Sequence, residues 1–550
     1  MTYPSPRVSG TVYGAFRHTV EEHAEREFLC VLPRTAASYG IEARPVSYRN
    51  AAGEVDVLFR RYQKAGYGHG HRVGLMLENR PTFFFHWLAL NALGVSVVPL
   101  NTEWRSAELE YLVGHSEICA AVVPESRGLD LIRAAQAAGR PLGVTQADLA
   151  DLPAAAFPPP AQTVPDADTE CALLYTSGTT GRPKGCVLPN EYYLWAGSWY
   201  AGLDDLCAIR PGGERLITPL PLSHMNAMAF STMVMLLTGG CIVQLDRFHP
   251  STWWESVRDS GATIVHYLGV MPPMLLGAPV SARDRDHAVR FGFGAGISPR
   301  LHTAFESRFG FPLIEAWAMT ETGAGAVVIA NHEPRKVGSA CFGRVGPQIE
   351  YRVVDDSDHD VAVGQPGELL VRHAGDAPRL GFFREYLKDP AATEAAWAGG
   401  YFHTGDVVQA DAEGDLHFVD RKKNVIRRSG ENISAVEVES VLLQHPRIAA
   451  VGVTAVPDEV RGDEVMACVV PRGQLDDAER AAFGQELTRF CLERLAYFKA
   501  PGYIGFCESL PLTATEKIQR ARLKELGQAL LGGPSCMDLR ALKKRTAAVT

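Results

Sequence analysis

The hydrophobic pattern of residues 72–100 predicts a strand, a helix and a second strand in immediate succession. Pro81 is placed to open the helix, because proline is tolerated in the first helical turn. Gly94 then separates the helical stretch from the β-branched run at 95–100. A helix that joins two strands in this way makes them a parallel pair, so the stretch indicates an α/β fold.

Similar alternation recurs at residues 107–125 and 252–269, where Gly261 lies between an amphipathic helix and a β-branched strand. Residues 151–170 are rich in proline and predict a surface loop. After about Tyr351, short apolar runs alternate with acidic turns, which favours antiparallel strands. Mixed helices and strands return towards the C-terminus, where Ser434 and Glu437 have the spacing of a capping box.

A charged stretch, "DRKKNVIRRSGEN" at residues 420–432, separates these two differently patterned regions. The chain has 550 residues, more than one hydrophobic core usually supports. We therefore expect an N-terminal domain at 1–422 and a smaller C-terminal domain at 423–550. The cleft between them is the expected active site.

Composition and charge exclude several classes of protein. The chain is 46% hydrophobic and 21% charged, as globular proteins are, and its net charge of -9 argues against a nucleic-acid partner. The first residues lack the pattern of a secretory signal. The apolar stretch 225–245 contains polar residues and a Gly239-Gly240 break, so it predicts a buried helix, a turn and a strand instead of a membrane span. The eleven cysteines lack metal-site spacing, which favours reduced thiols and a cytoplasmic location.

The segment "LLYTSGTTGRPKG", residues 173–185, has the composition of a phosphate-binding loop. Its glycines let backbone N–H groups approach an anion, its hydroxyls add donors, and Lys184 adds a positive charge. It is not a Walker loop, because Gly185 follows the lysine where that motif requires Ser or Thr. Taken alone, the segment is also compatible with a plain flexible loop.

Three further motifs follow in order: "AWAMTETG" at 316–323, "YFHTGDVV" at 401–408 together with the charged stretch, and "LPLTATEKIQRARL" at 510–523. Together the four motifs resemble the adenylate-forming superfamily of acyl-CoA synthetases, firefly luciferase and nonribosomal peptide synthetase adenylation domains. The resemblance covers about residues 10–530. "TATEKIQ" and "DRKKNVIRRSGENIS" resemble in particular the carnitine/crotonobetaine-CoA ligase-like branch.

This resemblance implies a fold and a reaction. The fold is α/β, with a large N-terminal domain of two α/β subdomains and a β-barrel-like subdomain, and a small mobile α+β C-terminal domain. In the reaction, a carboxylate attacks the α-phosphorus of ATP to give an acyl-adenylate and pyrophosphate, and the thiol of coenzyme A then displaces AMP. The first step joins two anions, so it needs cations, hydroxyl donors and Mg²⁺ in fixed geometry.

The resemblance also implies roles for individual residues. Lys517 would bridge the carboxylate and the α-phosphate, Thr320 would contact the α-phosphate, and Glu321 would hold Mg²⁺. Lys423 would be the hinge of the C-terminal domain, and Gly430 would approach coenzyme A after rotation. The other expected nucleotide-binding residues are Thr176, Ser177, Gly178, Thr179, Thr180, Gly181, Lys184, Gly294, Ala295, Gly296, Ala316, Trp317, Asp406 and Arg421.

The chain departs from the family pattern at three positions. Trp317 stands where tyrosine usually stacks on adenine, and an indole offers the same stacking with more area. Ala318 replaces a common glycine beside the acyl pocket, and Glu516 replaces a glycine before the catalytic lysine. We interpret the Glu516 difference as a character of the subgroup and not as a loss of activity.

The expected acyl-pocket residues are His224, Met225, Gly292, Ala318 and Met319. The glycines of "GFGAGIS", residues 292–298, are expected to leave room for the acid. No aspartate follows Leu222 to pair with an α-amine, which disfavours amino acids as substrates. The resemblance to the carnitine/crotonobetaine-CoA ligase-like branch favours short, polar or branched acids over long fatty acids. Aryl acids remain an alternative class of substrate. For His224, the alternative is a structural role as a hydrogen-bonded histidine of the core.

Free coenzyme A is the expected acceptor of the acyl group. The alternative enzyme is an acyl-AMP ligase that loads a carrier protein or another nucleophile, and a luciferase-like activity is left to assay. A non-catalytic nucleotide sensor is disfavoured because Lys517 and Glu321 are both present. The sequence leaves the oligomeric state open, with a homodimer as one alternative.

Overall fold

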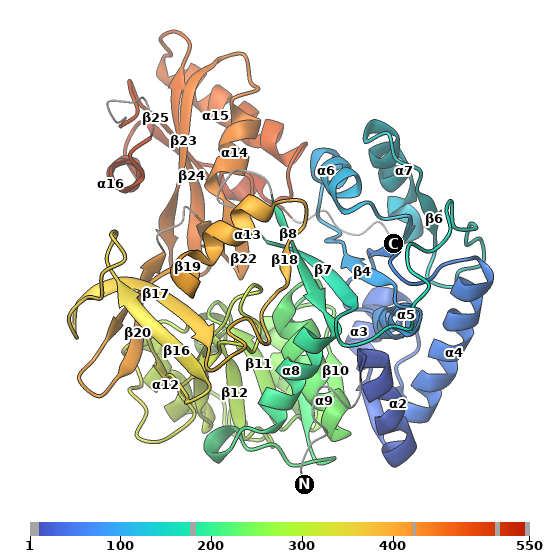
Figure 1. Cartoon of the computed structure of the whole chain (residues 1–550). Coiled ribbons are helices and arrows are strands. Elements are labelled where there is room, and N and C mark those ends of the chain that lie inside the picture. The colour runs from blue at the N-terminus through green and yellow to red at the C-terminus, as the bar shows by residue number, and fades with distance from the viewer. Residues whose placement is uncertain (1–9, 177–182, 422–424, 512–517, 545–550) are drawn as a thin grey trace.

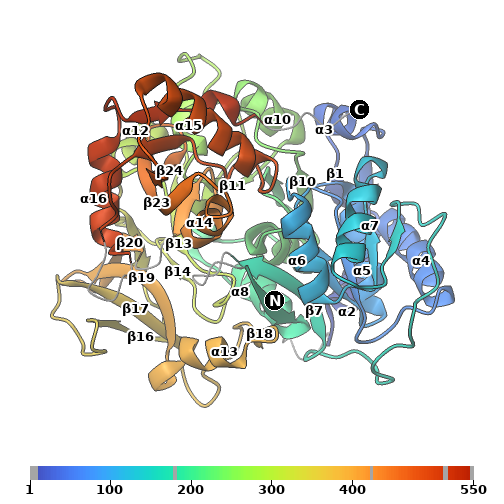
Figure 2. The ribbon, with the colours of Figure 1, turned by 90° about the horizontal axis from the view of Figure 1, so that it is seen from above.

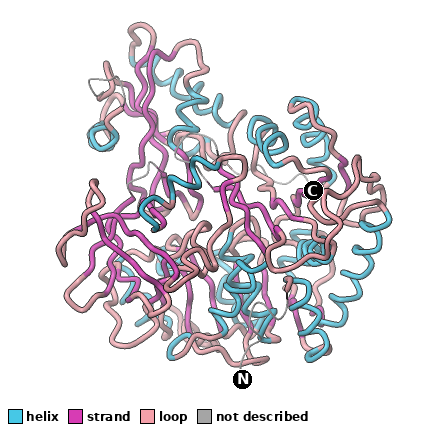
Figure 3. The backbone as a smooth tube through the Cα atoms, in the orientation of Figure 1, coloured by secondary structure: helices cyan, strands magenta, loops and turns pink. Residues whose placement is uncertain are grey.

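The computed structural model describes residues 10–176, 183–421, 425–511 and 518–544 (Figure 1). Three β-sheets organise the chain, and Figure 3 shows their strands in magenta with helices packed around them. In the parts that the structure describes, no helix has the length and apolar character needed to cross a membrane.

The first sheet contains the predicted strand–helix–strand unit. Its neighbours β7, β4, β3, β5 and β6 are parallel, and β8 and β18 extend its edge in antiparallel pairing. The helix α5 (Pro81–Ala92) joins β3 to its parallel partner β4, which confirms that prediction. The strands are β3 (Arg72–Leu75), β4 (Ser96–Pro99), β5 (Ala120–Val122), β6 (Gly143–Thr145), β7 (Glu170–Thr176), β8 (Lys184–Pro189) and β18 (Glu385–Tyr386).

The second sheet has thirteen strands and changes character at β13. One half is parallel in the order β1, β10, β9, β11, β12 and β13, with β2 antiparallel at the edge. The other half is antiparallel, as the pattern after Tyr351 predicted, and it continues directly from the parallel half at the β13–β14 pair. The parallel half contains β1 (Glu27–Cys30), β9 (Arg215–Thr218), β10 (Cys241–Gln244), β11 (Ile264–Leu268), β12 (Phe291–Ala295) and β13 (Leu313–Trp317), beside β2 (Pro45–Ser47). The antiparallel half contains β14 (Val328–Ile329), β15 (Cys341–Arg344), β16 (Ile349–Val354), β17 (Pro366–His373), β19 (Phe402–Ala410) and β20 (Asp415–Arg421).

Helices cover both sheets and fill the space between them. Residues of α2, α4, α5, α8 and α9 share one hydrophobic core with residues of both sheets, whereas α6 and α7 pack on the outer face of the first sheet. Residues of α10, α11 and α12 pack on the outer face of the second. The N-terminal helices are α2 (Val12–His23), α3 (Pro33–Tyr39), α4 (Tyr48–Lys64), α5, α6 (Ser106–Ser116), α7 (Gly128–Ala137), α8 (Asn190–Ala201), α9 (Thr232–Thr238), α10 (Trp253–Ser260), α11 (Met271–Leu276), α12 (Pro299–Phe309) and α13 (Pro390–Ala396).

The apolar stretch 225–245 has the predicted helix, turn and strand. It forms a π-helix over Asn226–Ser231, then α9, then β10, and Gly239 turns the chain with φ of 65°. Gly261, with φ of 61°, likewise ends α10 before β11. Both glycines adopt the left-handed conformation that side-chain-bearing residues disfavour, which is why they separate these elements.

The C-terminal part forms a third sheet of six strands, which Figures 1 and 2 show in orange to red beside the rest of the molecule. Its buried residues form a core that begins at Ile426, whereas the main N-terminal core reaches Leu416. The strands are β21 (Val425–Arg428), β22 (Glu431–Ser434), β23 (Ile448–Asp458), β24 (Gly462–Pro471), β25 (Tyr503–Phe506) and β26 (Cys536–Asp538), and the helices are α14 (Ala435–Leu442), α15 (Asp477–Leu492) and α16 (Arg520–Leu530).

Half of the predicted capping box is present at α14. The Ser434 side chain accepts the Glu437 backbone N–H at 3.3 Å. The Glu437 carboxylate instead accepts a hydrogen bond from the Lys499 ammonium at 2.8 Å. Lys499 also pairs at 2.5 Å with Glu108 of α6, so the expected local cap is replaced by a contact to the N-terminal part.

Candidate active site

A cavity of about 520 Å³ lies where strands of the parallel half of the second sheet end. Leu268, Ala295 and Trp317 are the last residues of β11, β12 and β13, and all three line the cavity. The carboxyl ends of parallel strands are where open α/β sheets bind ligands. Residues 429–432 of the C-terminal part form another wall.

Most residues singled out in the sequence meet at this cavity. Those that line it are Thr176, Lys184, His224, Met225, Gly294, Ala295, Gly296, Ala316, Trp317, Ala318, Met319, Thr320, Glu321, Asp406 and Gly430. Arg421, the last residue of β20, is the backbone partner of Asp406 in the β19–β20 ladder. Ser177, Gly178, Thr179, Thr180, Gly181, Lys423 and Lys517 lie outside the described residues.

Two glycines do not create the open space expected of them. Gly292 does not line the cavity, since a Cβ there would lie 2.5 Å from Leu313 Cδ2. A Cβ on Gly294 would lie 2.2 Å from the Tyr267 carbonyl oxygen. These glycines therefore allow neighbouring strands to pack closely, and the role of Gly292 in the acyl pocket stays a prediction.

The loop after β12 is held by a buried carboxylate. Glu315 accepts backbone N–H groups of Gly296 at 2.9 Å and Ile297 at 3.2 Å, and the Tyr267 hydroxyl at 2.5 Å. Burial raises the pKa of Glu315, although these donors favour its charged form. The carboxylate thus fixes the backbone of one cavity wall.

Trp317 and Asp406 join two motifs that are far apart in the sequence. The indole Nε1 of Trp317 donates to Asp406 Oδ2 at 2.9 Å. Both side chains are buried, at 6% and 1% exposure, yet both line the cavity. The pair therefore presents an aromatic face and a carboxylate in one fixed arrangement, which suits a nucleoside.

Glu321 forms the centre of a second polar group. Its Oε1 accepts the Thr176 hydroxyl at 3.2 Å and the Tyr386 hydroxyl at 3.0 Å. The Lys184 ammonium lies 4.6 Å from the centre of the Tyr386 ring. Burial, reinforced by the Glu321 charge, holds the pKa of Tyr386 well above its usual range, so the hydroxyl stays a donor. Tyr386 bridges two predicted residues, and no local sequence signal singled it out.

The donor set around Glu321 fits Mg²⁺ bound together with phosphate oxygens. Among the described residues, no group of three or more His, Cys, Asp and Glu side chains is arranged to hold a metal ion. Mg²⁺, however, typically takes one or two carboxylates and completes its shell with substrate phosphates and water. One buried carboxylate, beside the hydroxyl-bearing Thr176 and Thr320 on the cavity wall, meets that requirement.

His224 contacts the C-terminal part across the cavity. Its Nε2 lies 3.4 Å from Glu431 Oε2. Burial opposes protonation of His224, but the charge and hydrogen bond of Glu431 outweigh it and raise the histidine pKa. Next to this pair, a Cβ on Gly430 would lie 2.4 Å from Leu268 Cδ1. The segment 430–431 therefore packs tightly against the N-terminal walls of the cavity.

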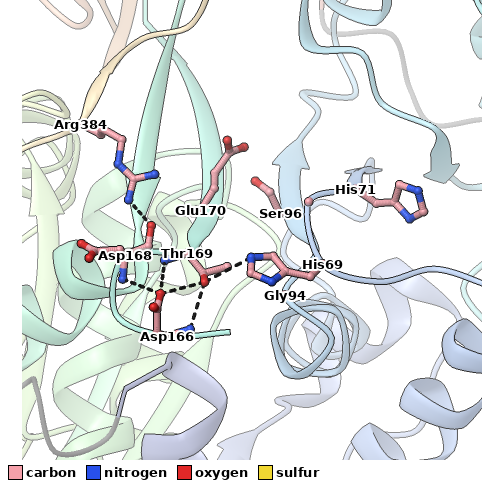
Figure 4. Close-up of a pocket in the computed structure, with 10 residues that line it drawn as sticks. His69, His71, Gly94, Ser96, Asp166, Asp168, Thr169, Glu170 and Arg384 are labelled. Atoms are coloured by element: carbon pink, nitrogen blue, oxygen red, sulfur yellow. Dashed lines mark hydrogen bonds between the residues drawn. The ribbon is translucent and has the colours of Figure 1, made fainter. Parts of the chain in front are cut away.

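A second cavity, of about 620 Å³, contains none of the predicted site residues (Figure 4). Asp166 Oδ1 accepts the backbone N–H groups of Asp168 and Thr169 and the Thr169 hydroxyl, each at 3.0 Å. Glu170 pairs with Arg72 at 2.7 Å, and the His71 side chain points away from these groups in Figure 4. The hydrogen bonds of Asp166 in this second cavity thus stabilise the turn that leads into β7.

Comparison with known families matches both parts of the chain. The model of the AMP-binding enzyme family matches residues 16–386. The model of the AMP-binding enzyme C-terminal domain matches residues 437–517.

Similar proteins include ligases and solved structures. The crotonobetaine/carnitine–CoA ligase of Shigella flexneri is 30% identical over 497 residues, which cover 87% of this chain and 93% of that protein. The o-succinylbenzoate CoA synthetase of Bacillus subtilis has a TM-score of 0.77 at 23% identity, covering 93% of this chain and 98% of that one. The amide bond synthetase of Marinactinospora thermotolerans also has a TM-score of 0.77 at 23% identity, covering 94% and 99%.

Proposed function

The chain belongs to the AMP-binding enzyme family, and from that premise we propose how its cavity carries out the reaction of an AMP-forming acid–CoA ligase. The enzyme activates a carboxylic acid with ATP to an acyl-adenylate and transfers the acyl group to coenzyme A, releasing pyrophosphate and AMP. The observation that carries the proposed residue roles is that side chains from separate motifs line one cavity.

In the first step, the chain must hold two anions together. We assign Trp317 to the adenine and Asp406 to the ribose hydroxyls, supported by their fixed mutual arrangement. Lys184 and residues 176–181 would hold the leaving phosphates, and Thr320 the α-phosphate. Glu321 would hold Mg²⁺, which neutralises phosphate charge when bound. Lys517 is proposed to bridge the acid and the α-phosphate.

In the second step, the thiol must reach the acyl-adenylate. Gly430 and Glu431 already lie on the cavity wall, which supports an orientation of the C-terminal domain suited to this step. We propose that the domain, divided from the rest at 422/423, rotates about Lys423 between this orientation and one that delivers Lys517. Free coenzyme A is the proposed acceptor.

The acid would occupy the end of the cavity lined by His224, Met225, Ala318 and Met319. We propose a short, polar or branched acid, and the names of the crotonobetaine/carnitine–CoA ligases support a small acid. The eleven cysteines are free thiols, which supports a cytoplasmic location. A homodimer is one candidate assembly, and light scattering during size-exclusion chromatography tests it.

A screen of pyrophosphate release over a panel of carboxylic acids, with and without coenzyme A, tests the proposal. The expected result is ATP-dependent pyrophosphate release with a subset of short acids, and sustained AMP release only when coenzyme A is present. Acid-dependent pyrophosphate release without any increase in AMP release on addition of coenzyme A would instead support the alternative, an acyl-AMP ligase that loads a carrier protein or another nucleophile. Pyrophosphate release that no acid stimulates would contradict both enzymes.

A further inference from the structure

Asn226 opens the π-helix that forms one wall of the cavity. The wide turn is held by side chains that reach five residues back: Ser231 Oγ donates to the Asn226 carbonyl at 3.3 Å, and Thr232 Oγ1 to the Ala227 carbonyl at 2.7 Å. Asn226 and Phe230 of this helix both line the cavity. Such wide turns are rare and frequently occur at functional sites, so the Asn226 side chain needs an explanation.

Behind this wall lies a buried histidine. His266 of β11 is fully buried, and its Nδ1 lies 2.9 Å from Asn226 Oδ1 and 2.8 Å from Ser231 Oγ. Its Nε2 lies 3.0 Å from the hydroxyl of Tyr200, which is also fully buried. Burial lowers the pKa of His266 to about 3, so the imidazole is neutral and carries a single N–H.

The partners determine which nitrogen of His266 holds that proton. Among the described residues, Nε2 is the one hydrogen-bond partner of the fully buried Tyr200 hydroxyl. Burial raises the pKa of Tyr200, so the hydroxyl keeps its proton, and that proton is left without an acceptor unless the hydroxyl donates to Nε2. The proton of His266 is then on Nδ1, and Asn226 Oδ1 accepts it. Ser231 is compatible with this assignment, because its own hydroxyl proton goes to a backbone carbonyl. The hydrogen-bond network therefore turns the amide nitrogen of Asn226 away from His266.

The surroundings of Asn226 are otherwise mostly apolar. Met225, Phe230, Leu268 and Phe293 also line the cavity, and the Phe293 ring centroid lies 4.8 Å from that of Tyr200 and 5.1 Å from that of His266. An oriented donor in an apolar wall is how binding sites usually fix the identity of a ligand. A ligand that lacks the matching acceptor leaves the donor without a partner, which costs affinity.

We infer that Asn226 presents its amide N–H groups to the acyl chain, and that the acid carries an uncharged acceptor oxygen, as short hydroxy and oxo acids do. The inference rests on the proposed function and adds to it the class of acid. A second carboxylate fits less well, because Asn226 is neutral and offers no charge to pair with it. Tyr200 and His266 are positioning residues, which fix the orientation of the Asn226 amide.

Matched acids test this inference on the full-length enzyme. Each straight-chain acid from propanoate to hexanoate is compared with its hydroxy and oxo derivatives by pyrophosphate release, and the readout is the ratio of their kcat/KM values. We expect at least one derivative to exceed its parent acid by about tenfold or more, and Asn226→Leu to lower this ratio by about tenfold. Tyr200→Phe should lower this ratio less, because the Asn226 amide is still present and only the hydrogen bonds that orient it are weakened.

Asn226→Asp gives a sharper test with almost the same side-chain shape. A carboxylate only accepts hydrogen bonds, so this variant should reject the oxo acid relative to the hydroxy acid, whereas the wild type takes both. The comparison is made within one protein, so partial loss of folded enzyme does not affect it. An unchanged oxo-to-hydroxy ratio in Asn226→Asp overturns the inference.

Two results separate this inference from the proposed function. If the wild type uses acids without an acceptor oxygen as well as or better than their derivatives, the inference fails and the ligase function stands. If no acid, including longer and aryl acids, stimulates ATP-dependent pyrophosphate release, the proposed function fails and the inference fails with it. A ratio that stays the same in Asn226→Leu also rules out the proposed role of this residue.

Discussion

The indole N–H of Trp317 donates to the carboxylate of Asp406 at 2.9 Å, so the end of β13 and the strand β19 are joined by one buried hydrogen bond. Trp317 stands where the wider family usually has tyrosine. A phenol has no N–H at this position, so the tryptophan both supplies an aromatic face and fixes the carboxylate beside it.

Trp317→Phe should weaken nucleotide binding more than acid binding. The change keeps an aromatic ring but removes a donor from a buried carboxylate, which costs about 1–3 kcal/mol. We expect the KM for ATP to rise about tenfold, as measured by pyrophosphate release. Trp195→Phe is the matched control, because its indole donates to the Ala324 carbonyl at 3.2 Å and does not line the cavity. Equal effects of the two changes would argue against the role of Trp317.

Glu321→Gln should raise the Mg²⁺ concentration needed for half-maximal turnover, by about tenfold or more. The amide can keep a hydrogen bond with Thr176 or Tyr386 but loses the charge that a hard cation requires. Tyr386→Phe is the control, because it removes a donor and leaves the carboxylate charged. An unchanged magnesium dependence in Glu321→Gln would exclude a metal-binding role.

The sequence predicted local structure well where proline and glycine mark the ends of elements. Pro81 and Gly94 bracket α5, and the parallel pairing of β3 and β4 followed from that spacing. The surroundings of Gly292 and Gly294, which were expected to leave room for the acid, depend on Leu313 and Tyr267 of neighbouring strands. One sequence alone does not reveal which strands pair, and therefore which side chains of a neighbouring strand lie against each glycine.

The same limit applies to the site. The motifs indicated most of the cavity lining, because each motif is local. Tyr386 and Asn226 were missed because their roles depend on partners far along the chain, Glu321 and His266. Glu437 has the right spacing for a capping box, yet it binds Lys499 because the packing of two domains outweighs a local cap.

Lys517→Ala should separate the two half-reactions. Lys517 lies outside the described residues, so this prediction depends on the motif alone. Loss of a positive charge that stabilises the transition state should raise the activation free energy of adenylation by roughly 3 kcal/mol or more. Thioester formation from supplied acyl-adenylate should stay largely intact. Lys524→Ala, on the exposed face of α16, is the control. Near-normal adenylation in Lys517→Ala would refute the assignment.

Glu431→Gln should lower the pKa of His224. The carboxylate raises this pKa above its usual 6.5, so the charged contact is fully present below that value and is lost as the pH rises through the raised pKa. An NMR titration of the imidazole signals, assigned with His224→Gln, gives the midpoint directly. The midpoint should fall in the Glu431 variant, and identical midpoints would show that the contact does not form in solution.

Lys499 connects the two domains through a buried cluster with two carboxyl groups. Its ammonium lies 2.5 Å from Glu108 of α6 and 2.8 Å from Glu437 of α14, and all three residues are buried. Glu437 Oε2 is buried without a hydrogen-bond partner among the described residues. Burial opposes the charge of Lys499, yet the two carboxylates outweigh it and raise the lysine pKa.

Lys499→Met should therefore favour separation of the domains, since it leaves two carboxylates facing each other at the interface. Breaking such a cluster typically costs about 3–5 kcal/mol. Because this interface accompanies the orientation in which Gly430 lines the cavity, we expect thioester formation from supplied acyl-adenylate to slow more than adenylation does. Adding Glu108→Gln and Glu437→Gln to the variant should recover part of the loss, because it removes the uncompensated charges. An equal effect on both half-reactions, or no recovery in the triple variant, would show that the cluster stabilises the fold without selecting this orientation.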